Sequence, residues 1–362
     1  MSDPTPDPDR SVAPGRRRRM RSRRVLLIAM SLIGLLVVGV GVGAGVITSR
    51  LNGNIERIGD PFEALPNRPA VPTSAPDAIA DSPGKPLNIL VVGSDSRVSA
   101  GDPSQWAKGG QRTDAIMILH LPADRKSAYL MSIPRDSWVD IPGHGTAKVN
   151  AAFSYGGPAL LIQTIEQLTQ VRIDHLAISD FESFTSMTDA LGGVQITVPV
   201  DTYRDGKLVA AAGTQLLDGA QALTYVRERY TLARGDFDRV QRQQNWMRAI
   251  FTRAASKGTL TSPTTLLPFL DTVTKSVAVD DGFTLGTMRS LAVSMRGVRA
   301  KDVTFFTVPV AGTGRSPDGR QSIVNLNRKA FDELMVAVAN DKVAAYLADH
   351  SDDVDTLKAA VS

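Results

Sequence analysis

The sequence contains no cysteine, and only four of its 362 residues are histidines. Without cysteine the chain forms no disulfide bonds and no thiolate metal sites. The histidines lie far apart in the sequence, and we assign none of them as a metal ligand. They are His120, His144, His175 and His350. A metal site in this chain would therefore depend on oxygen ligands, which suit a hard cation.

The chain has no excess of positive charge outside its first residues. Its formal net charge is +4, but residues 1–24 alone hold eight arginines and three aspartates, so the remainder has a net charge of −1. Because the basic residues are confined to this Pro-, Asp- and Arg-rich segment, the charge balance argues against a nucleic-acid-binding fold. We expect residues 1–24 to be a disordered cytoplasmic tail.

Charged residues are absent from residues 25–48, a run of 24 mostly apolar residues. As a helix this run would extend about 36 Å, which is enough to cross a bilayer core of about 30 Å. A cleaved signal peptide is the alternative, but its apolar region is usually only about 7–15 residues long. We therefore predict a single transmembrane helix over 25–48 in the cell membrane. The arginines before it place the N-terminus in the cytoplasm and the rest of the chain outside.

Proline is concentrated after this run. Residues 60–86 contain seven prolines, a composition typical of an extended spacer. We expect residues 49–86 to be a linker that holds a folded domain away from the membrane. The folded domain is expected to cover residues 87–342, followed by a polar C-terminal tail over 343–362.

Strand and helix patterns alternate along residues 87–342. Apolar runs predict strands near 87–93, 115–121, 127–133, 175–180, 194–200 and 303–310. Helical spacing of apolar residues predicts helices near 158–170, 181–193, 217–230, 236–255, 262–276, 284–296 and 325–341. The second and third strands are close enough in sequence to form a hairpin. This order predicts an α/β domain in which helices flank both faces of a mixed β-sheet, an α-β-α sandwich.

Opposite charges lie at the ends of the two hairpin strands. Asp114 stands at the start of one strand, and Arg135 lies just past the end of the other. If the strands pair antiparallel, both residues lie at one edge of the sheet, together with Arg112 and Asp136. Asp95 joins them if the first strand of the domain is a neighbour that ends at the same edge. The alternative is that these charges only solvate strand ends or form surface ion pairs.

Further arginines lie on two of the predicted helices. Arg239 and Gln243 are four residues apart and share one helix face. Arg227 and Arg229 lie near the end of the preceding helix. Arginine forks suit phosphate or pyrophosphate oxygens, and carboxylates suit Mg²⁺, so together these residues describe a site for a metal-bridged pyrophosphate. An exposed helix face is the alternative for Arg239 and Gln243, and Lys148 fits a phosphate contact and an ordinary surface position equally well.

The segments that carry these residues occur in an order that resembles a known family. They include NILVVGSDSR, RTDAIMILHL, LMSIPRDSWVDIPGHG, LDGAQALTYVRERY and DFDRVQRQQNWM. Together these motifs resemble the LytR–CpsA–Psr family of bacterial cell-wall glycopolymer transferases, over residues 87–255 and in outline to residue 342. The short tail, the single anchor and the domain outside the membrane are similar to that family's layout.

The resemblance implies a membrane-anchored phosphotransferase that depends on Mg²⁺, with Mn²⁺ as an alternative. Such enzymes move a glycopolymer from a polyprenyl-pyrophosphate carrier to a peptidoglycan hydroxyl and form a phosphodiester. The magnesium ligands implied by the motifs are Asp95 and Asp114, either of which is a candidate general base. The implied phosphate and pyrophosphate contacts are Arg97, Arg112, Arg135, Arg227, Arg229, Arg239 and Gln243. The Ala- and Arg-rich composition is typical of a high-GC actinobacterium, so we expect a family member of the actinobacterial type, with arabinogalactan as the candidate polymer.

Two other functions are left open by the sequence. A pyrophosphatase would use the same clamp with water as the acceptor, and a non-catalytic regulator or receptor would bind the lipid without turnover. A polyprenyl chain also needs an apolar slot. The predicted helices at 158–170 and 181–191 are candidates to line it against the sheet, although most of their apolar residues must belong to the core. No separate C-terminal binding domain is expected.

Overall fold

The computed structural model of the protein describes residues 47–70, 84–94, 113–198, 200–204, 206–227, 236–260 and 262–358. The chain divides into two compact units, residues 1–50 and residues 51–362, and the fold described below is that of the second unit. The predicted membrane-spanning run lies outside the described residues except at its last two positions. Among the residues that are described, no helix combines the length and apolar character needed to cross a membrane.

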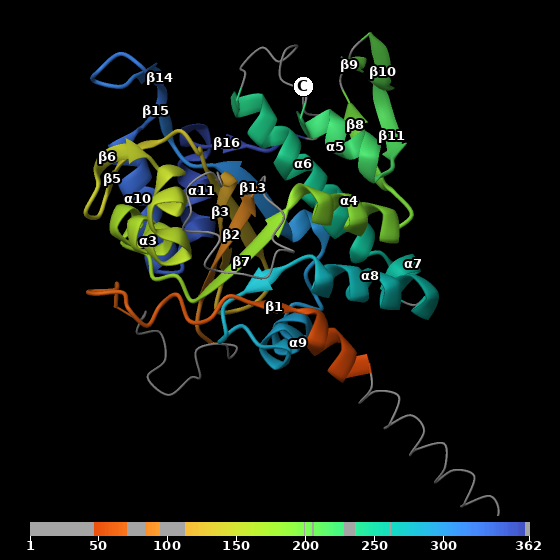
Figure 1. The fold of residues 1–362 in the computed structure, drawn as a ribbon. Helices are drawn as coiled ribbons and strands as arrows, with labels where there is room; N and C mark the ends of the chain where they lie inside the picture. The colour runs from red at the N-terminus through yellow and green to blue at the C-terminus, as the bar shows by residue number, and fades with distance from the viewer. Residues whose placement is uncertain are drawn as a thin grey trace, which may run out of the picture. The chain divides into compact units, whose positions relative to one another are not determined.

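A mixed β-sheet lies at the centre of the domain (Figure 1). Its strand order is β1-β12-β7-β2-β3-β4-β13-β16. The strands are β1 Glu56–Arg57, β2 Leu87–Ser94, β3 Thr113–Leu121, β4 Ala128–Ile133, β7 His175–Asp180, β12 Ala278–Val279, β13 Val303–Thr307 and β16 Asp355–Thr356. β2 runs parallel to β7 and antiparallel to β3, and β4 runs antiparallel to β3 and parallel to β13. The predicted mixed sheet is therefore confirmed.

Helices cover both faces of this sheet, as the sequence predicts. The helices between residues 151 and 349 are α3 Ala151–Thr169, α4 Phe181–Ala190, α5 Gly219–Arg227, α6 Asp236–Ala254, α7 Lys257–Leu260, α8 Pro263–Lys275, α9 Leu285–Ser294, α10 Arg328–Ala339 and α11 Val343–Asp349. α3, α10 and α11 pack on the face that carries Ile116 and Ile118. α6 and α9 pack on the opposite face, to which Met117 and Leu119 contribute. Alternate residues of β3 therefore enter separate cores, as the period of a strand requires.

Burial on both sides explains the uninterrupted apolar runs of the central strands. All six residues of β4 are buried, a pattern typical of a strand covered by helices on two faces. A further core lies between α4, α5, α6 and the hairpin of β8 (Val194–Val198) and β11 (Gly213–Leu217). Three smaller hairpins complete the fold: β5–β6 (Trp138–Ile141 and Gly145–Lys148), β9–β10 (Thr202–Arg204 and Lys207–Ala210) and β14–β15 (Val310–Arg315 and Ser322–Leu326).

α3 begins at Ala151, seven residues before the predicted start at Pro158. Gly156 and Gly157 interrupt it with non-helical backbone angles, and Gly157 has a φ of +63° that favours glycine. Pro158 follows this break and opens the second part of the helix. Proline is tolerated there because its missing N–H has no helical acceptor at a helix start. The sequence therefore predicted the second part of α3 but not the first.

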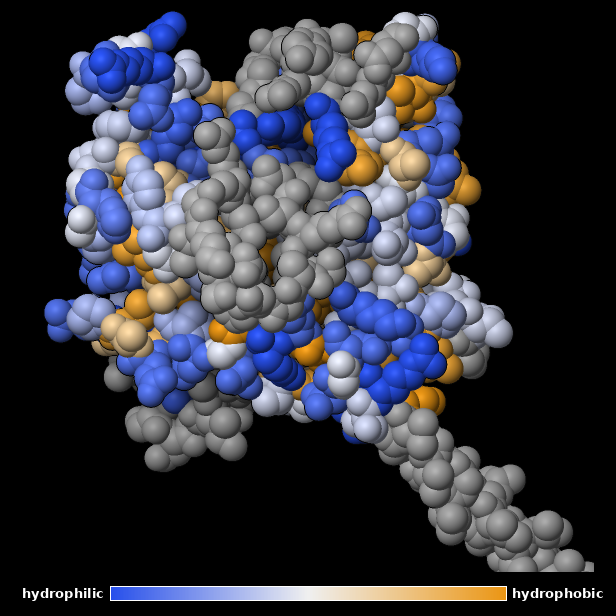
Figure 2. All heavy atoms as spheres, in the orientation of Figure 1, coloured by the Kyte–Doolittle hydropathy of each residue, from blue (hydrophilic) through white to orange (hydrophobic). Residues whose placement is uncertain are grey.

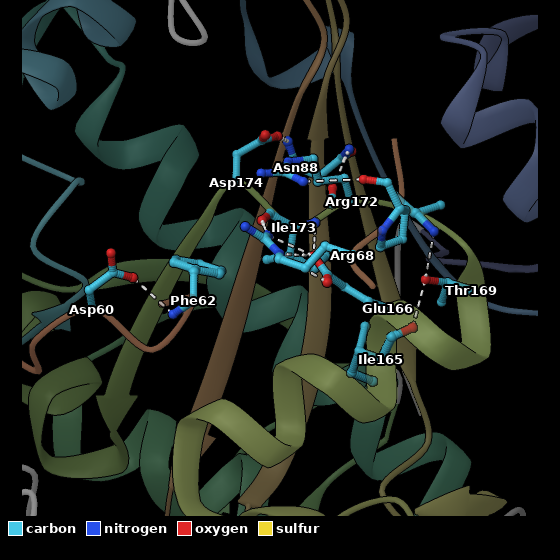
Figure 3. A network of polar contacts seen from close by, with 12 residues as sticks. Asp60, Phe62, Arg68, Asn88, Ile165, Glu166, Thr169, Arg172, Ile173 and Asp174 are labelled. Atoms are coloured by element: carbon cyan, nitrogen blue, oxygen red, sulfur yellow. Dashed lines mark hydrogen bonds and ion pairs between the residues drawn. The ribbon is translucent and has the colours of Figure 1, made fainter. Parts of the chain in front are cut away.

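The linker predicted over 49–86 is wrong for its described part up to residue 70. β1 pairs with β12, and Ile55 and Ile58 are buried in the domain. Arg68 donates to both carboxylate oxygens of Glu166 and to the carbonyl of Ile173 (Figure 3). Apolar and charged residues in this Pro-rich segment thus contact the domain. Such contacts cannot be predicted from the amino-acid composition of the segment.

The polar tail predicted over 343–362 is also wrong for residues 343–358. α11 buries Val343 and Tyr346 against the domain. β16 then extends the sheet by pairing antiparallel with β13. Val354 and Leu357, on either side of β16, are buried as well. A strand of two residues has no periodicity of its own, so the sequence does not indicate it.

A buried polar network joins β2 and β3 to the segment that follows α10. The Nδ1 of the fully buried His120 lies 2.8 Å from the Oδ1 of Asn88, and its Nε2 lies 3.0 Å from the Oδ1 of Asp341. Asn88 donates from Nδ2 to the carbonyl of Arg172, so its oxygen faces the imidazole. Burial raises the pKa of Asp341, but hydrogen bonds from His120 and from the backbone N–H of Ala123 outweigh it and hold the pKa below its usual value.

We expect acid to destabilise the fold partly through Asp341. Because its pKa is lower in the folded state, its stabilising contribution is present above the unfolded pKa of about 4 and is lost as the pH falls through the folded pKa. The urea midpoint of Asp341→Asn should therefore fall less steeply below pH ~4 than that of the wild type. Asp332→Asn, on the exposed surface of α10, should keep the wild-type slope. Parallel curves for wild type and Asp341→Asn would contradict this role.

Candidate active site

An ion pair at one edge of the sheet joins the start of β3 to the residues that follow β4. Arg135 donates from Nη1 to the Oδ1 of Asp114. β3 and β4 pair with Ile116 opposite Ile133, and two further steps of this register bring residue 114 opposite residue 135. The side chains of Arg135 and Asp114 are only 20% and 19% exposed, so solvent screens the pair less than it screens a surface pair. The predicted meeting of Asp114 and Arg135 is confirmed.

The neighbouring charges Asp136 and Lys148 form a second ion pair. The Nζ of Lys148, at the end of β6, lies 3.0 Å from the Oδ1 of Asp136. The structure therefore gives Lys148 a structural role, because its salt bridge ties the β5–β6 hairpin to the turn after β4. A contact of Lys148 with phosphate stays a prediction. The backbone N–H of Asn150 donates to the carbonyl of Arg135 at 3.2 Å. Together these contacts fix the turn from which Arg135 reaches Asp114.

α6 crosses the second face of the sheet antiparallel to β2. Gln243 lines a small cavity with Gly93, near the end of β2. Phe251, about two turns later on α6, lines a pocket with Ile89, near the start of β2. The residue numbers of the helix thus rise as those of the strand fall. The first turns of α6 therefore lie at the edge of the sheet where β2 ends.

This direction brings Arg239 and Gln243 to the edge that carries Asp114. Ala115, next to Asp114 in β3, lines the same cavity as Gln243. Arg239 lies one turn nearer the helix start, about 6 Å further toward the edge. Arg239 is 7% and Gln243 5% exposed, so the exposed-face alternative is wrong for both. Hydrophilic residues are visible over this end of α6 in Figure 2.

The amide of Gln243 is suited to an additional polar partner. Its Oε1 is buried and accepts no hydrogen bond from the residues that the structure describes. Buried amide groups normally have such a partner. A rotation of the amide exchanges its oxygen and nitrogen, so the same position can present a donor to a phosphate oxygen.

Polar residues on other faces of α6 fix the helix in place, and the sequence analysis did not identify them. Gln244 donates from Nε2 to the Oγ of Ser132 in β4 at 2.7 Å. Gln241 donates from Nε2 to the Oδ1 of Asp355 in β16 at 2.7 Å. The signal that would have found them is the run DRVQRQQN, which is polar on every face of a helix. A helix of this kind is stable inside a protein only if polar partners surround it.

Arg242 and Trp246 connect α6 to the core beside α4 and α5. Arg242 donates to the carbonyl of Tyr225 at 3.0 Å, and its guanidinium lies 4.5 Å from the centroid of the Tyr225 ring. Burial raises the pKa of Tyr225, and the positive charge of Arg242 partly opposes this rise. Trp246 donates from Nε1 to the Oγ1 of Thr188 in α4 at 2.9 Å. These contacts hold α5, whose last residue is the exposed Arg227, beside α6.

Four of the predicted site residues lie outside the described residues. They are Asp95, Arg97, Arg112 and Arg229. β2 ends at Ser94, which pairs with Thr113 at the start of β3. The chain therefore leaves the sheet and returns to it at the edge that carries Asp114, so the predicted position of the first strand is confirmed. The meeting of Asp95 with Asp114 stays a prediction.

The described part of the chain holds no cluster of three or more acidic, histidine or cysteine side chains suited to a metal ion. Asp114 is the described member of the predicted pair of magnesium ligands. Its carboxylate has the oxygen donors that Mg²⁺ prefers, and Mg²⁺ usually takes only one or two carboxylates together with substrate phosphates and water. The chemistry of Asp114 therefore fits such an ion.

An apolar pocket of about 870 Å³ lies on the same face of the sheet as α6. The sheet, α6 and α9 line it with Ile89, Leu119, Leu130, Met247, Phe251, Met288, Leu291, Met295 and Phe305. Val91 and Met247 line both this pocket and the small cavity beside Gln243. We call the larger pocket the apolar slot. It is thus adjacent, through Val91 and Met247, to the cavity that reaches the Asp114 edge.

The helices predicted to line such a slot are only partly the right ones. α3 lies on the opposite face of the sheet, where Leu161, Ile162 and Ile165 are fully buried core residues. The prediction is therefore wrong for residues 158–170. α4 contributes Phe184 to the small cavity beside Gln243 but does not line the slot. The helices that do line the slot, together with the sheet, are α6 and α9, in which apolar positions are interspersed with arginines.

Comparison with known proteins relates the chain to proteins of cell-wall biosynthesis. Residues 66–338 match the LytR_cpsA_psr family. The chain is 43% identical over 232 residues to the probable cell wall biosynthesis protein LcpB of Corynebacterium glutamicum, covering 62% of this chain and 54% of LcpB. It is 36% identical over 182 residues to the polyisoprenyl-teichoic acid–peptidoglycan teichoic acid transferase TagT of Bacillus subtilis, covering 48% of this chain and 55% of TagT. The chain spans about half the length of these curated relatives.

A solved structure of the family protein TagT with bound octaprenyl pyrophosphate lipid shares the fold. The TM-score is 0.54 at 26% sequence identity, and the match covers 77% of this chain and 97% of that chain. The region that matches the family contains the ion pair of Asp114 and Arg135, α6 and the apolar slot. On this match, which extends over most of the domain, the chain belongs to the LytR–CpsA–Psr family.

Proposed function

We propose that the chain transfers a glycopolymer from a polyprenyl-pyrophosphate carrier to a peptidoglycan hydroxyl, forming a phosphodiester and releasing polyprenyl phosphate. The observation that carries this proposal is the position of the Arg135–Asp114 pair and the apolar slot on connected parts of one sheet. A lipid pyrophosphate combines a highly charged head with a long apolar tail, so it needs both features. The name of TagT describes a transfer of this kind for teichoic acid.

The pyrophosphate would lie at the sheet edge, near Arg135 and Arg239. Phosphoryl transfer depends mainly on positioning and on neutralising the charge of the transferring group. Arg135 is held by Asp114, and Arg239 is largely buried, so both guanidinium groups lose little freedom when they bind. Gln243 would add a hydrogen bond from the neighbouring turn of α6. We assign the remaining phosphate contacts to Arg97, Arg112, Arg227 and Arg229.

Asp95 and Asp114 are the residues that we assign to hold Mg²⁺, with Mn²⁺ as the alternative. The ion, when bound, would neutralise charge on the pyrophosphate oxygens. Either carboxylate is a candidate to accept the proton of the attacking hydroxyl, because each would lie beside the transferring phosphate. The Arg135 guanidinium keeps the Asp114 carboxylate at the edge of the sheet.

The polyprenyl tail would occupy the apolar slot. Its lining of methionine, leucine and phenylalanine side chains suits a branched hydrocarbon, and methionine adapts readily to irregular shapes. We propose that the uncharged run 25–48 anchors the chain in the membrane that holds the donor, with the domain outside the cytoplasm. Arabinogalactan stays the candidate polymer, on composition alone.

The test is turnover by the full chain reconstituted in lipid vesicles. The donor is a short polyprenyl-pyrophosphate glycan and the acceptor a peptidoglycan fragment, with and without Mg²⁺. A metal-dependent, phosphodiester-linked product would support the transferase. Free phosphorylated glycan without coupled product would indicate a pyrophosphatase, and tight donor binding without turnover would indicate a lipid receptor. Arabinogalactan and teichoic acid donors, compared side by side, test the choice of polymer.

Filling the apolar slot should weaken binding of long donors selectively. Ala292 lines the slot from α9, and Ala292→Trp should displace several methylene groups of the tail. Because each buried methylene contributes about 0.8 kcal/mol, we expect the KM for a long-chain donor to rise about tenfold or more. The KM for a donor with a very short prenyl chain should stay unchanged. Val336→Trp, at an exposed position on α10, is the matched control. Equal effects on long and short donors would contradict the slot.

A further inference from the structure

α9 and the turn after it carry a basic stripe on the side that faces away from the sheet. Met288, Leu291 and Met295 pack into the apolar slot. Arg289 and Val293 are four residues apart in α9 and share one face of the helix. Arg296 lies in the turn that follows the end of α9 at Ser294, and it lines the same groove as Arg289 and Val293. The two arginines are exposed, and Val293 is 52% exposed. The apolar side of α9 is thus covered by the domain, and what remains exposed is positive charge beside one aliphatic side chain, a combination suited to the headgroup region of an anionic membrane.

The turn between β3 and β4 completes a groove along this stripe. The groove has a volume of about 870 Å³, and its charged lining residues are Asp124, Arg125, Lys126, Arg289 and Arg296. Arg125 donates to the carbonyls of Leu121 and Pro122 and so fixes the turn. Within the described part of the chain, no ion pair engages the side chains of Lys126, Arg289 and Arg296. The groove therefore presents positive charge that the neighbouring described residues do not neutralise.

The chain enters the domain close to this groove. Arg57 in β1 donates from Nη1 to the carbonyls of Asp280 and Phe283, at 3.1 and 2.9 Å, in the loop that leads into α9. Figure 1 shows β1 and α9 near one another at the lower end of the sheet. Arg57 follows the end of the uncharged run at Thr48 by only nine residues. A fully extended chain of that length spans roughly 30 Å, so a membrane anchor in that run would keep α9 close to the bilayer.

We propose that α9 and the β3–β4 turn form a docking surface for the anionic headgroups of membrane phospholipids. Lys126, Arg289 and Arg296 contact the lipid phosphates, and Val293 reaches the boundary of the acyl chains. This inference rests on the membrane anchor of the proposed function. It adds an orientation, because α9 is also a wall of the apolar slot, and Arg296 lines both the groove and the slot. Docking would thus turn the slot toward the bilayer from which a polyprenyl tail must come.

The absence of cysteine allows a direct test with the full chain. Ser290→Cys places a single thiol in the groove, at an exposed position of α9, and a fluorophore attached there reports contact with the membrane. The labelled chain is reconstituted in vesicles of phosphatidylcholine, with or without phosphatidylglycerol, that contain a headgroup-linked quencher. Thr313→Cys, on the β14–β15 hairpin, provides the control position.

We expect strong quenching at Ser290→Cys in vesicles that contain phosphatidylglycerol. Each basic residue near an anionic surface strengthens its attachment about fivefold, so Lys126→Gln/Arg289→Gln should lose about half of the quenching or more. High salt and pure phosphatidylcholine should have the same effect. Arg315→Gln/Arg320→Gln removes the same charge from the β14–β15 hairpin and should change nothing, and Thr313→Cys should show little quenching in all vesicles.

Two results would overturn the inference in different ways. In the first, the chain remains in the vesicles after an alkaline wash, but the quenching at Ser290→Cys is the same with and without phosphatidylglycerol and in the double variant. The proposed docking surface would then be wrong, whereas the membrane anchor would be supported. If the alkaline wash removes the chain, the anchor is wrong and the docking surface falls with it. The turnover assay is read separately, since neither Lys126 nor Arg289 lines the slot.

Discussion

Arg135→Ala is expected to lower the rate of glycopolymer transfer by about 10²- to 10³-fold, the usual cost of removing one group that stabilises charge in a transition state. The fold should persist, because the Arg135 side chain lies at the edge of the sheet and is 20% exposed. Arg135→Lys keeps the charge but loses the planar fork, so it should recover only part of the activity. Single-turnover rates at saturating donor, with near-ultraviolet circular dichroism as the check on folding, provide the measurement.

Arg328→Ala is the matched control for this substitution. Arg328 forms an exposed ion pair with Asp332 on α10, on the other face of the sheet, and its loss should leave transfer at the wild-type rate. A folded Arg135→Ala protein with wild-type turnover would refute the assignment of this arginine to the pyrophosphate.

Asp114→Asn tests whether the partner of Arg135 is also a ligand of the metal. If Asp114 both holds Arg135 and binds Mg²⁺, the variant should require a much higher Mg²⁺ concentration for half-maximal activity. The double variant Asp114→Asn/Arg135→Ala should lose less activity than the two single losses combined, because groups that act together are not additive. If the Mg²⁺ concentration for half-maximal activity were unchanged in Asp114→Asn, Asp114 would not be a ligand of the metal.

Glu166→Ala should reduce the free energy of unfolding by about 3–5 kcal/mol, the cost of leaving one member of a buried ion pair without its partner. Glu166 is 4% and Arg68 14% exposed at the side chain, with Arg68 Nη2 2.7 Å from Glu166 Oε1. The backbone N–H of Ile173 also donates to this carboxylate, at 2.9 Å. The guanidinium of Arg68 further stacks over Phe62, with 4.5 Å to the ring centroid (Figure 3).

Urea unfolding of the full chain in detergent, followed by near-ultraviolet circular dichroism, measures this effect. Asp332→Ala breaks an exposed ion pair of similar length and should cost no more than about 1 kcal/mol. Equal midpoints for Glu166→Ala and Asp332→Ala would show that residues 60–70 do not depend on this contact. Arg68→Ala/Glu166→Ala should be more stable than the sum of the single losses predicts.

The strands around the candidate site could be predicted because their burial is visible in the sequence. β3 and β4 are apolar on both faces and joined by a short polar connection, so their antiparallel pairing follows from local signals alone. That pairing sets the register, and the register places Asp114 opposite Arg135. The prediction of this pair needed no knowledge of distant contacts.

The parts that could not be predicted depend on partners far away in the chain. β1, β12 and β16 have two residues each, and only their neighbours in the sheet define them as strands. The burial of Arg239 and Gln243 depends on how α6 lies across the sheet, which is set by contacts such as that of Gln244 with Ser132. The sequence of a buried polar helix resembles that of an exposed helix, so the two cannot be distinguished until the partners of the polar side chains are known.

The C-terminal strand has a practical consequence for producing the domain. The family match ends at residue 338, whereas β16 begins at Asp355. A gene trimmed to the family boundary would leave the backbone groups of β13 open along the apolar Phe305 and Phe306, an edge that invites pairing between molecules and aggregation. It would also remove Asp355, the acceptor of the Gln241 hydrogen bond that helps to hold α6 in place. A recombinant version meant to stay soluble should therefore continue at least through Leu357.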